Sequence, residues 1–118
     1  MQTHHLKRST CPITNLLDIV GDKWTLLVIR DLFLGKRRYA QFIESKEKMP
    51  TNILAERLRR IEEFGLVTKN PYQTNPLRFE YSLTEKGVAL EPILNEMARW
   101  GLQYIQETKL FPKASSGL

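Results

Sequence analysis

Residues 49–65 have the sequence MPTNILAERLRRIEEFG, which predicts one helix with two different faces. Apolar side chains recur at three- and four-residue spacing, as expected of a helix that packs on a core. They are Ile53, Leu54, Leu58, Ile61 and Phe64. We expect Thr51 to be the N-cap of this helix and Gly65 to end it in the left-handed conformation.

The opposite face of this helix is polar at its N-terminal end and basic further along. It begins with Thr51, Asn52, Ala55 and Glu56, and the arginines at 57, 59 and 60 follow. Small polar residues followed by arginines suit a helix whose first turns enter the major groove of DNA. A solvated charged face, which is common on amphipathic helices, is the alternative.

Length and composition restrict the class of protein. With 118 residues, of which 42% are hydrophobic and 26% charged, the chain is expected to form one globular domain with its own core. It has no apolar run of the roughly 20 residues that a membrane-spanning helix needs. It also lacks a signal-peptide pattern, so we expect a cytoplasmic protein. The single cysteine excludes an intrachain disulfide.

The positive charge is concentrated in the middle of the chain. Between residues 36 and 78 there are ten basic and five acidic residues, and this excess of five equals the formal net charge of +5. The eight basic and eight acidic residues elsewhere cancel. An excess confined to one region is expected of a surface that binds a polyanion.

Helices are predicted before residues 49–65. Residues 12–20 and 23–34 should form two helices, with Asp22 as the cap of the second. The second helix is apolar on nearly all sides, which places it at the centre of the core. A short helix over 39–44 should follow, with Tyr39, Phe42 and Ile43 facing inward.

A hairpin and a long helix are predicted after Gly65. Residues 66–70 and 78–83 read as two antiparallel strands, and Gln73, Thr74 and Asn75 belong to the tip between them. Thr84 should cap a helix from Glu85 to about Glu107. That helix has more apolar residues than one packed side needs, so we expect it to contact a second copy of the chain.

This order of elements is that of an α+β, mainly helical, winged helix-turn-helix domain, in which the helix over 51–64 reads the major groove and the hairpin is the wing. The candidates for base contacts are Thr51, Asn52, Ala55, Glu56 and Arg59. The candidates for phosphate contacts are Arg37, Arg38, Arg57, Arg60, Lys69 and Arg78. Arg57 could instead hold a carboxylate inside the fold, and the wing tip over 73–75 either reaches a minor groove or only turns.

Several motifs together resemble the HxlR-type winged helix regulators, which are related to the larger MarR group. They are Cys11-Pro12, Gly21 with Lys23-Trp24-Thr25-Leu26-Leu27, Arg37-Arg38-Tyr39 with Phe42, Thr51-Asn52-Ile53-Leu54 with Arg57-Leu58, Gly65-Leu66-Val67, Tyr81-Ser82-Leu83-Thr84-Glu85-Lys86-Gly87, and Trp100. Two departures are visible. Asp22 stands where a second glycine is usual, and Pro50-Thr51 replaces a Ser-Pro opening of the reading helix.

The resemblance implies a bacterial homodimeric transcription factor that binds double-stranded DNA at a pseudo-palindromic operator. It implies a DNA-binding domain over 11–109, with long first and last helices that form the dimer interface. From their composition, the polar and basic residues 1–10 are expected to form a flexible arm and residues 110–118 a flexible tail. The interface candidates are Ile13, Leu16, Leu17, Leu94, Met97, Trp100 and Tyr104. Repression is the commoner outcome when a small dimer without an activation domain occupies a promoter.

Cys11 is a candidate redox sensor. It stands at a helix N-terminus, where free backbone amides favour the thiolate, and Lys7 and Arg8 act in the same direction. Some members of the resembling family sense oxidants or electrophiles with a cysteine at this position. The alternative is a small residue without chemistry. With one thiol per chain, sensing would use the second subunit, a small thiol or an adduct.

An enzyme is not expected, because the sequence contains no catalytic constellation. His4 and His5 have no further ligands at metal-binding spacing, so neither a metal nor a cofactor is expected. The alternative function is a winged-helix protein-interaction module without sequence-specific DNA binding. Because phosphate neutralisation releases counterions, a steep fall of affinity with salt would distinguish DNA binding from this alternative. The sequence does not identify a small-molecule or oxidant signal.

Overall fold

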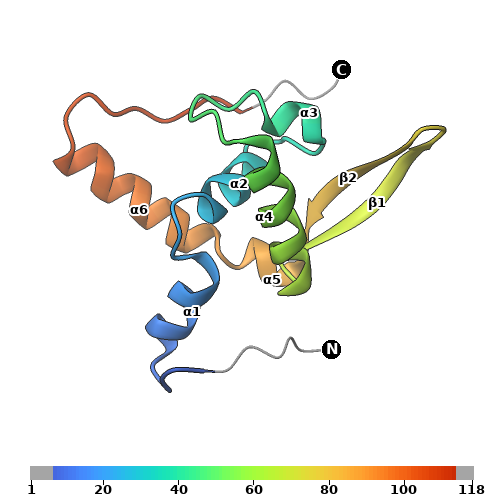
Figure 1. The fold of residues 1–118 in the computed structure, drawn as a ribbon. Helices are drawn as coiled ribbons and strands as arrows, with labels where there is room; N and C mark the ends of the chain where they lie inside the picture. The colour runs from blue at the N-terminus through green and yellow to red at the C-terminus, as the bar shows by residue number, and fades with distance from the viewer. Residues whose placement is uncertain (1–6, 114–118) are drawn as a thin grey trace.

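A computed structural model describes residues 7–113 of the chain. The elements in order are α1 (Pro12–Val20), α2 (Thr25–Phe33), α3 (Tyr39–Phe42), α4 (Thr51–Glu63), β1 (Val67–Thr74), β2 (Leu77–Leu83), α5 (Glu85–Val88) and α6 (Glu91–Tyr104) (Figure 1). The predicted order of four helices followed by a hairpin is confirmed. The arm over 1–10 and the tail over 110–118 lie partly outside the described residues, and His4 and His5 lie wholly outside them.

The core lies where α2 crosses α4. Val28, Ile29 and Leu32 of α2 are buried. The buried side chains of α4 are Leu54, Leu58 and Ile61. The central position expected of the second helix is therefore confirmed. In α3 only Phe42 is buried, and it meets the ring of Tyr81 edge-on at 6.3 Å between centroids. The prediction was wrong for Tyr39 and Ile43, whose side chains are exposed.

The two ends of α4 differ in how well they were predicted. Its N-cap is Pro50, and Thr51 is already the first helical residue, so the predicted capping role of Thr51 is wrong. The Pro50 carbonyl accepts the first helical bond from the Leu54 amide at 3.0 Å. At the other end Gly65 has φ +77, the left-handed conformation that glycine adopts without strain.

The wing is longer than the sequence indicated. Strand β1 continues through Pro71, and the turn falls at Asn75-Pro76, which is a cis peptide bond. Pro71 is tolerated within β1 because both strands of a two-stranded sheet are edge strands. The register shifts between Pro71 and Gln73, which leaves Tyr72 as the extra residue of a bulge. The wing also borders the turn before α3, because the Tyr81 amide donates to the Arg37 carbonyl at 2.8 Å.

The prediction of a single long C-terminal helix is wrong, because the chain forms two separate helices there. Helix α5 has four residues, and α6 has fourteen and ends at Tyr104. Pro92 explains the break. Inside a continuous helix its ring would clash with the carbonyl four residues earlier, whereas in the first turn of α6 its missing N–H costs nothing. The predicted cap is confirmed, since the Thr84 hydroxyl accepts from the Gly87 amide at 3.1 Å.

Figure 1 shows the wing projecting on the side of the molecule opposite α6, with α4 between them. Helix α1 has only nine residues, so the N-terminal helix is not long. Within the part of the chain that the structure describes, no helix has the length and apolar character needed to cross a membrane.

Candidate nucleic-acid interface

The N-terminal half of α4 presents a small polar surface to solvent. Its buried side chains fix the rotation of the helix on the core, so the opposite side faces outward. Thr51, Asn52 and Ala55 lie on that side and are exposed. The side chains of Thr51 and Asn52 form no hydrogen bond with other residues of 7–113, which leaves their polar groups available to an external partner.

Helix α3 fixes the start of α4. The Tyr39 hydroxyl donates to the Thr51 carbonyl at 2.7 Å, which joins the first residues of the two helices. The start of α3 is held by Gln41, whose side-chain oxygen accepts from the amides of Arg37 and Arg38 at 2.7 and 2.9 Å. The two helices of the helix-turn-helix are therefore connected at the end that carries the polar surface.

Glu56 and Arg59 form a charged row along α4. One Glu56 oxygen is bonded to Arg57, and the other accepts from Arg59 at 3.2 Å. Arg59 also bonds Glu63 at 2.8 Å, and its side chain is 58% exposed. Both side chains can reach solvent, but a contact from Glu56 to a base requires exchange of its arginine partners.

Arg57 is held by the loop between α1 and α2. Its Nε donates to Asp22 at 2.8 Å, and only 17% of its side chain is exposed. The prediction that Asp22 is the cap of a helix beginning at Lys23 is wrong, because α2 begins at Thr25 and its N-cap is Trp24. The Asp22 carboxylate still accepts from the amides of Trp24 and Thr25 and from the buried Thr25 hydroxyl. Of the two roles left open for Arg57, the structure shows the contact to a carboxylate within the fold.

The hydrogen bonds to Asp22 alter its ionisation. Partial burial works against the charged form, but the bonds from Thr25, Arg57 and Trp24 outweigh it. Together they hold the pKa of the Asp22 carboxyl well below its usual range. The same pairing raises the pKa of Arg57, although burial opposes this. This charged link ties α4 to the start of α2.

Two further phosphate candidates bond backbone carbonyls. Arg60 donates to the carbonyl of Asp18 in α1 at 2.6 Å and is partly buried. Arg37 donates to the carbonyls of Leu32 and Lys36 at 2.8 and 2.9 Å, which ties its side chain to the end of α2. Arg37 remains exposed, whereas Arg60 spans from α4 to α1.

The wing and the turn before α3 carry the remaining phosphate candidates. Arg78 is exposed and forms no ion pair with any residue of 7–113. The ammonium of Lys69 lies over the Phe79 ring at 4.6 Å. Arg38 stacks on Tyr72 at 3.6 Å and contacts Glu80 at 3.3 Å. These side chains extend the positive surface from α3 along the hairpin.

At the wing tip, Gln73 and Thr74 belong to strand β1, and Asn75 begins the turn. The Gln73 side chain donates to the Pro76 carbonyl at 3.1 Å, so it stabilises the turn in this structure. Thr74 and Asn75 are exposed. Tyr72, which sequence reasoning did not single out, supports Arg38 from the bulge. Its one signal in the sequence is that it is the only aromatic residue in a polar turn.

The interface candidates of α1 and α6 are divided between two environments. Leu16 and Leu94 are partly buried and pack against the core. Ile13, Leu17, Met97, Trp100 and Tyr104 are exposed by 69, 51, 52, 59 and 63%. The rings of Trp100 and Tyr104 lie 5.1 Å apart. The exposed five leave large apolar side chains in contact with solvent on α1 and α6, whereas the other two stabilise the chain itself.

Cys11 is an exposed free thiol directly before α1. Hydrogen bonds from the Thr14 amide and hydroxyl and from the Ile13 amide stabilise the thiolate and lower the pKa of Cys11. Among residues 7–113 no three His, Cys, Asp or Glu side chains are grouped so that they could hold a metal ion.

Comparisons with known proteins agree with this geometry. The chain is 36% identical to the helix-turn-helix-type transcriptional regulator sll1512 of Synechocystis over 97 residues, 82% of this chain and 72% of that protein. Its fold matches the reduced redox regulator HypR with a TM-score of 0.75 and 33% identity, covering 81% of this chain and 95% of HypR. It matches the reduced transcriptional regulator YodB of Bacillus subtilis with a TM-score of 0.67 and 29% identity, covering 86% of this chain and 100% of YodB.

These similarities confirm the winged helix-turn-helix fold and the prediction that the protein is a DNA-binding regulator rather than an enzyme. The family model of the HxlR-like helix-turn-helix matches residues 19–109, which include every element from α2 to α6. The chain therefore belongs to the HxlR-like helix-turn-helix family of transcriptional regulators.

Proposed function

We propose that this protein is a homodimeric repressor that binds a pseudo-palindromic operator, with α4 in the major groove and the wing beside it. The observation that carries the proposal is the exposed start of α4, where Thr51, Asn52 and Ala55 are free of internal side-chain bonds. In this binding mode the N-terminal residues of the second helix contact base edges. Asn52 is suited to pair with adenine through its amide.

Phosphate contacts come from the turn and the wing in this proposal. Lys69 and Arg78 are exposed on the hairpin, and Arg38 is exposed in the turn beside it. Arg59 is exposed on α4. Arg37 remains a candidate because its guanidinium is at the surface. Arg57 and Arg60 are bonded within the fold, so their role is to orient α4, and a phosphate contact from either is secondary.

Footprinting on the DNA upstream of the protein's own gene tests the proposal. At low salt we expect one protected region with approximate two-fold symmetry, and the affinity should fall steeply as salt rises because bound counterions are released. A complex with DNA that shows no preferred site at any salt concentration contradicts sequence-specific binding. A salt-insensitive complex with a protein would instead favour the interaction-module function.

Cys11 supports a second part of the proposal, which is control of DNA binding by oxidation. Its exposed thiol has a lowered pKa. HypR, whose fold this chain shares, is named as a redox regulator, and YodB, which is also similar, is described in a reduced form. The oxidant removes two electrons and two thiol protons, and the Cys11 sulfurs of the two subunits form one disulfide. A mixed disulfide with a small thiol has the same electron balance.

The matching experiment treats the DNA complex with diamide. We expect the wild-type protein to release the operator and the Cys11→Ser variant to retain it. Non-reducing electrophoresis should show a covalent dimer of the wild-type chain alone, or mass spectrometry a small-thiol adduct. Equal release from both proteins contradicts sensing by Cys11 and leaves the DNA-binding proposal intact.

A further inference from the structure

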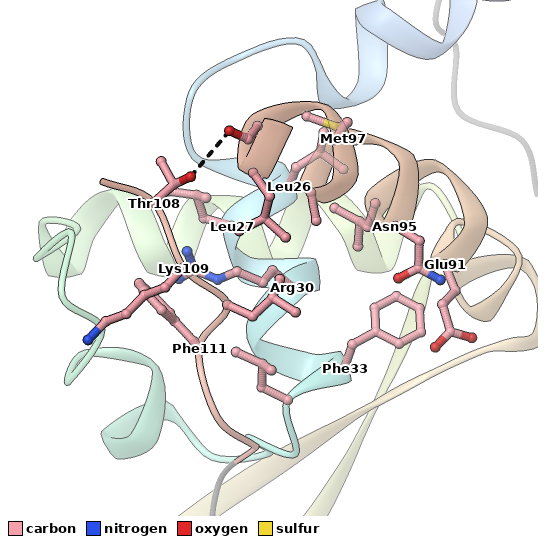
Figure 2. A pocket seen from close by; sticks show the side chains of 16 residues that line it. Leu26, Leu27, Arg30, Phe33, Glu91, Asn95, Met97, Thr108, Lys109 and Phe111 are labelled. Carbon is pink, nitrogen blue, oxygen red and sulfur yellow. Dashed lines mark hydrogen bonds between the residues drawn. The ribbon is translucent and has the colours of Figure 1, made fainter. Parts of the chain in front are cut away.

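A cavity of about 570 Å³ lies between α2, α6 and the segment that follows α6 (Figure 2). Its volume is within the range of about 300 to 1,000 Å³ that is typical of small-molecule sites. The wall is mostly apolar and includes Leu26, Leu27 and Phe33 of α2 and Leu94 and Ala98 of α6. It is separate from the DNA-facing start of α4 and from Cys11, neither of which lines it.

The chain itself closes one side of this cavity. Thr108 donates to the carbonyls of Gly101 and Ile105 at 3.2 and 2.9 Å, which turns the chain back after α6. Phe111 then lies near two cations, with the Arg30 guanidinium 5.0 Å and the Lys46 ammonium 5.7 Å from its ring centroid. Residues 108–111 form a strap across the cavity, and Phe111 holds its far end against α2.

The strap decides between the candidate occupants. A partner helix or a second copy of the chain could not enter without displacing it. The exposed Trp100 and Tyr104 project from a different side of α6 than Ala98, so a partner centred on them leaves most of the cavity unfilled. Met97, which is exposed and also lines the cavity, lies at the border between the two surfaces. Residues 114–118 have the sequence ASSGL, in which only Leu118 is a large apolar side chain, so this segment matches the apolar wall poorly. A small molecule fits the space that remains.

The charges around the cavity define the class of ligand. Arg30 is already bonded to Asp31 at 2.9 Å and to Glu47 at 2.8 Å, so its charge is compensated. The ammonium group of Lys109 points away from the cavity in Figure 2. At the other end Glu91 lies beside Asn95, where its carboxylate would repel an anion. The Asn95 amide has no hydrogen-bond partner among residues 7–113 and can bond a carbonyl or hydroxyl group.

We propose that this cavity is a binding site for an uncharged, mainly apolar small molecule that carries a hydrogen-bonding group toward Asn95. Ligand atoms would pack between Phe33 and the leucines of α2 and α6, and the Phe111 strap would close over them. The site lies on α2, which also packs against α4, so it is placed to influence the DNA-binding helix. Binding itself does not depend on the proposed repressor function.

Gly101 offers a way to fill the cavity without disturbing the helix. It lines the cavity, and a Cβ added to it would meet no atom within 4 Å. The variant Gly101→Leu therefore places a leucine side chain in the open space. Gln103→Leu is the matched control, because it adds the same side chain to the same helix at an exposed position that does not line the cavity.

The test titrates the full-length protein with N-phenyl-1-naphthylamine, an uncharged dye that fluoresces in apolar sites. We expect saturable binding to the wild type, at least tenfold weaker binding to Gly101→Leu, and binding within twofold of wild type for Gln103→Leu and Trp100→Ala. Ala98→Met is a second filling variant in case Gly101→Leu does not fold, and circular dichroism identifies folded proteins.

Three results would overturn the proposal. The first is that the wild type shows no saturable dye binding. The second is that a folded filling variant binds the dye as tightly as the wild type. The third is that Trp100→Ala loses dye binding while the filling variants keep it. The last result would place the dye on the exposed apolar surface of α6. Because the titration contains no DNA, its outcome is independent of whether the operator proposal holds.

Discussion

Asn52 and Arg78 represent two kinds of DNA contact that substitution can separate. Asn52 is exposed at the start of α4, whereas Arg78 is exposed on the wing without an ion pair to any residue of 7–113. Removing a base contact costs about 1–3 kcal/mol at one site, while removing a phosphate contact weakens binding to all sequences. The two variants should therefore change affinity in different ways.

We expect Asn52→Ala to lower operator affinity about tenfold and to leave binding to unrelated DNA unchanged. Arg78→Ala should weaken both and should reduce the slope of log affinity against log salt by about one, because one phosphate is no longer neutralised. Fluorescence anisotropy over a series of salt concentrations measures both effects. Gln103→Ala is the control, because Gln103 is an exposed residue of α6 away from the proposed DNA-binding surface. An equal fall in affinity for operator and unrelated DNA in Asn52→Ala would show that Asn52 does not read a base.

Asp22 gives a prediction about pH. Its pKa is lowered in the folded chain by its bonds to Thr25 and Arg57, so folding is favoured when the carboxyl is ionised. The stabilisation is fully present above the unfolded pKa of about 4 and is lost as pH falls toward the folded value. We expect Asp22→Asn to lower the free energy of unfolding by about 1–2 kcal/mol at pH 7 and by less at pH 3.

Urea unfolding at both pH values measures this difference. The control is Glu96→Gln, since Glu96 pairs with the exposed Arg99 at the surface and should have a small effect at either pH. A destabilisation by Asp22→Asn that is equally large at pH 3 and pH 7 would mean that the carboxylate charge is not the cause.

The sequence named arginines as candidates for DNA contacts, but it did not show which of them are bonded within the fold. The apolar stripe of α4 was sufficient to place Thr51, Asn52 and Ala55 outward, because helical spacing fixes the relation between the two faces. The partners of Arg57 and Arg60 lie 35 and 42 residues away in the chain. Such pairings depend on how α1 and α2 pack against α4, which no local pattern encodes.

At the level of elements, the helix boundaries followed residues with backbone restrictions. Gly65 ended α4 where expected, and Pro92 split the last helix where a continuous helix was expected. Pro92 could have indicated a new helix start in the sequence, but the apolar residues on both sides of it were interpreted as one continuous helix. The hairpin was recognised from alternation, and its true length was missed because Pro71 resembled a turn residue.

Two glycines should respond to alanine in opposite ways. A Cβ on Gly87 would clash with the Leu66 carbonyl oxygen, so α5 must move away from the loop before β1. A Cβ on Gly101 would meet open space within α6. We expect Gly87→Ala to destabilise the protein by about 2 kcal/mol or more. Gly101→Ala should stabilise it by about 0.5–1 kcal/mol, because glycine disfavours helix.

Thermal unfolding of the two variants beside the wild type measures these changes. The melting temperature should fall for Gly87→Ala and rise for Gly101→Ala. The same substitution is made in each case, so the opposite signs would come from the surroundings. A fall of similar size for both variants would contradict the contact geometry around Gly87.

On the scale of the whole molecule, the helices α1 and α6, which carry exposed apolar side chains, lie away from the wing (Figure 1). Ile13, Leu17, Trp100 and Tyr104 are large apolar side chains that are each more than half exposed, and exposed apolar surface of this kind marks interaction sites. A two-fold interface between copies of the chain would cover this surface on both subunits. The wing and α4 of each subunit would then stay free to contact DNA.

We expect the wild-type protein to sediment at twice the mass of one chain and Trp100→Glu to sediment as a monomer, because a buried unpaired charge strongly opposes association. With one reading helix in place of two, operator affinity should fall by at least about tenfold, while weak binding to unrelated DNA remains. Gln103→Glu introduces the same charge at an exposed neighbouring position and should stay dimeric. A wild-type monomer that protects a single half-site, or a dimeric Trp100→Glu with full affinity, would show that this surface has another use.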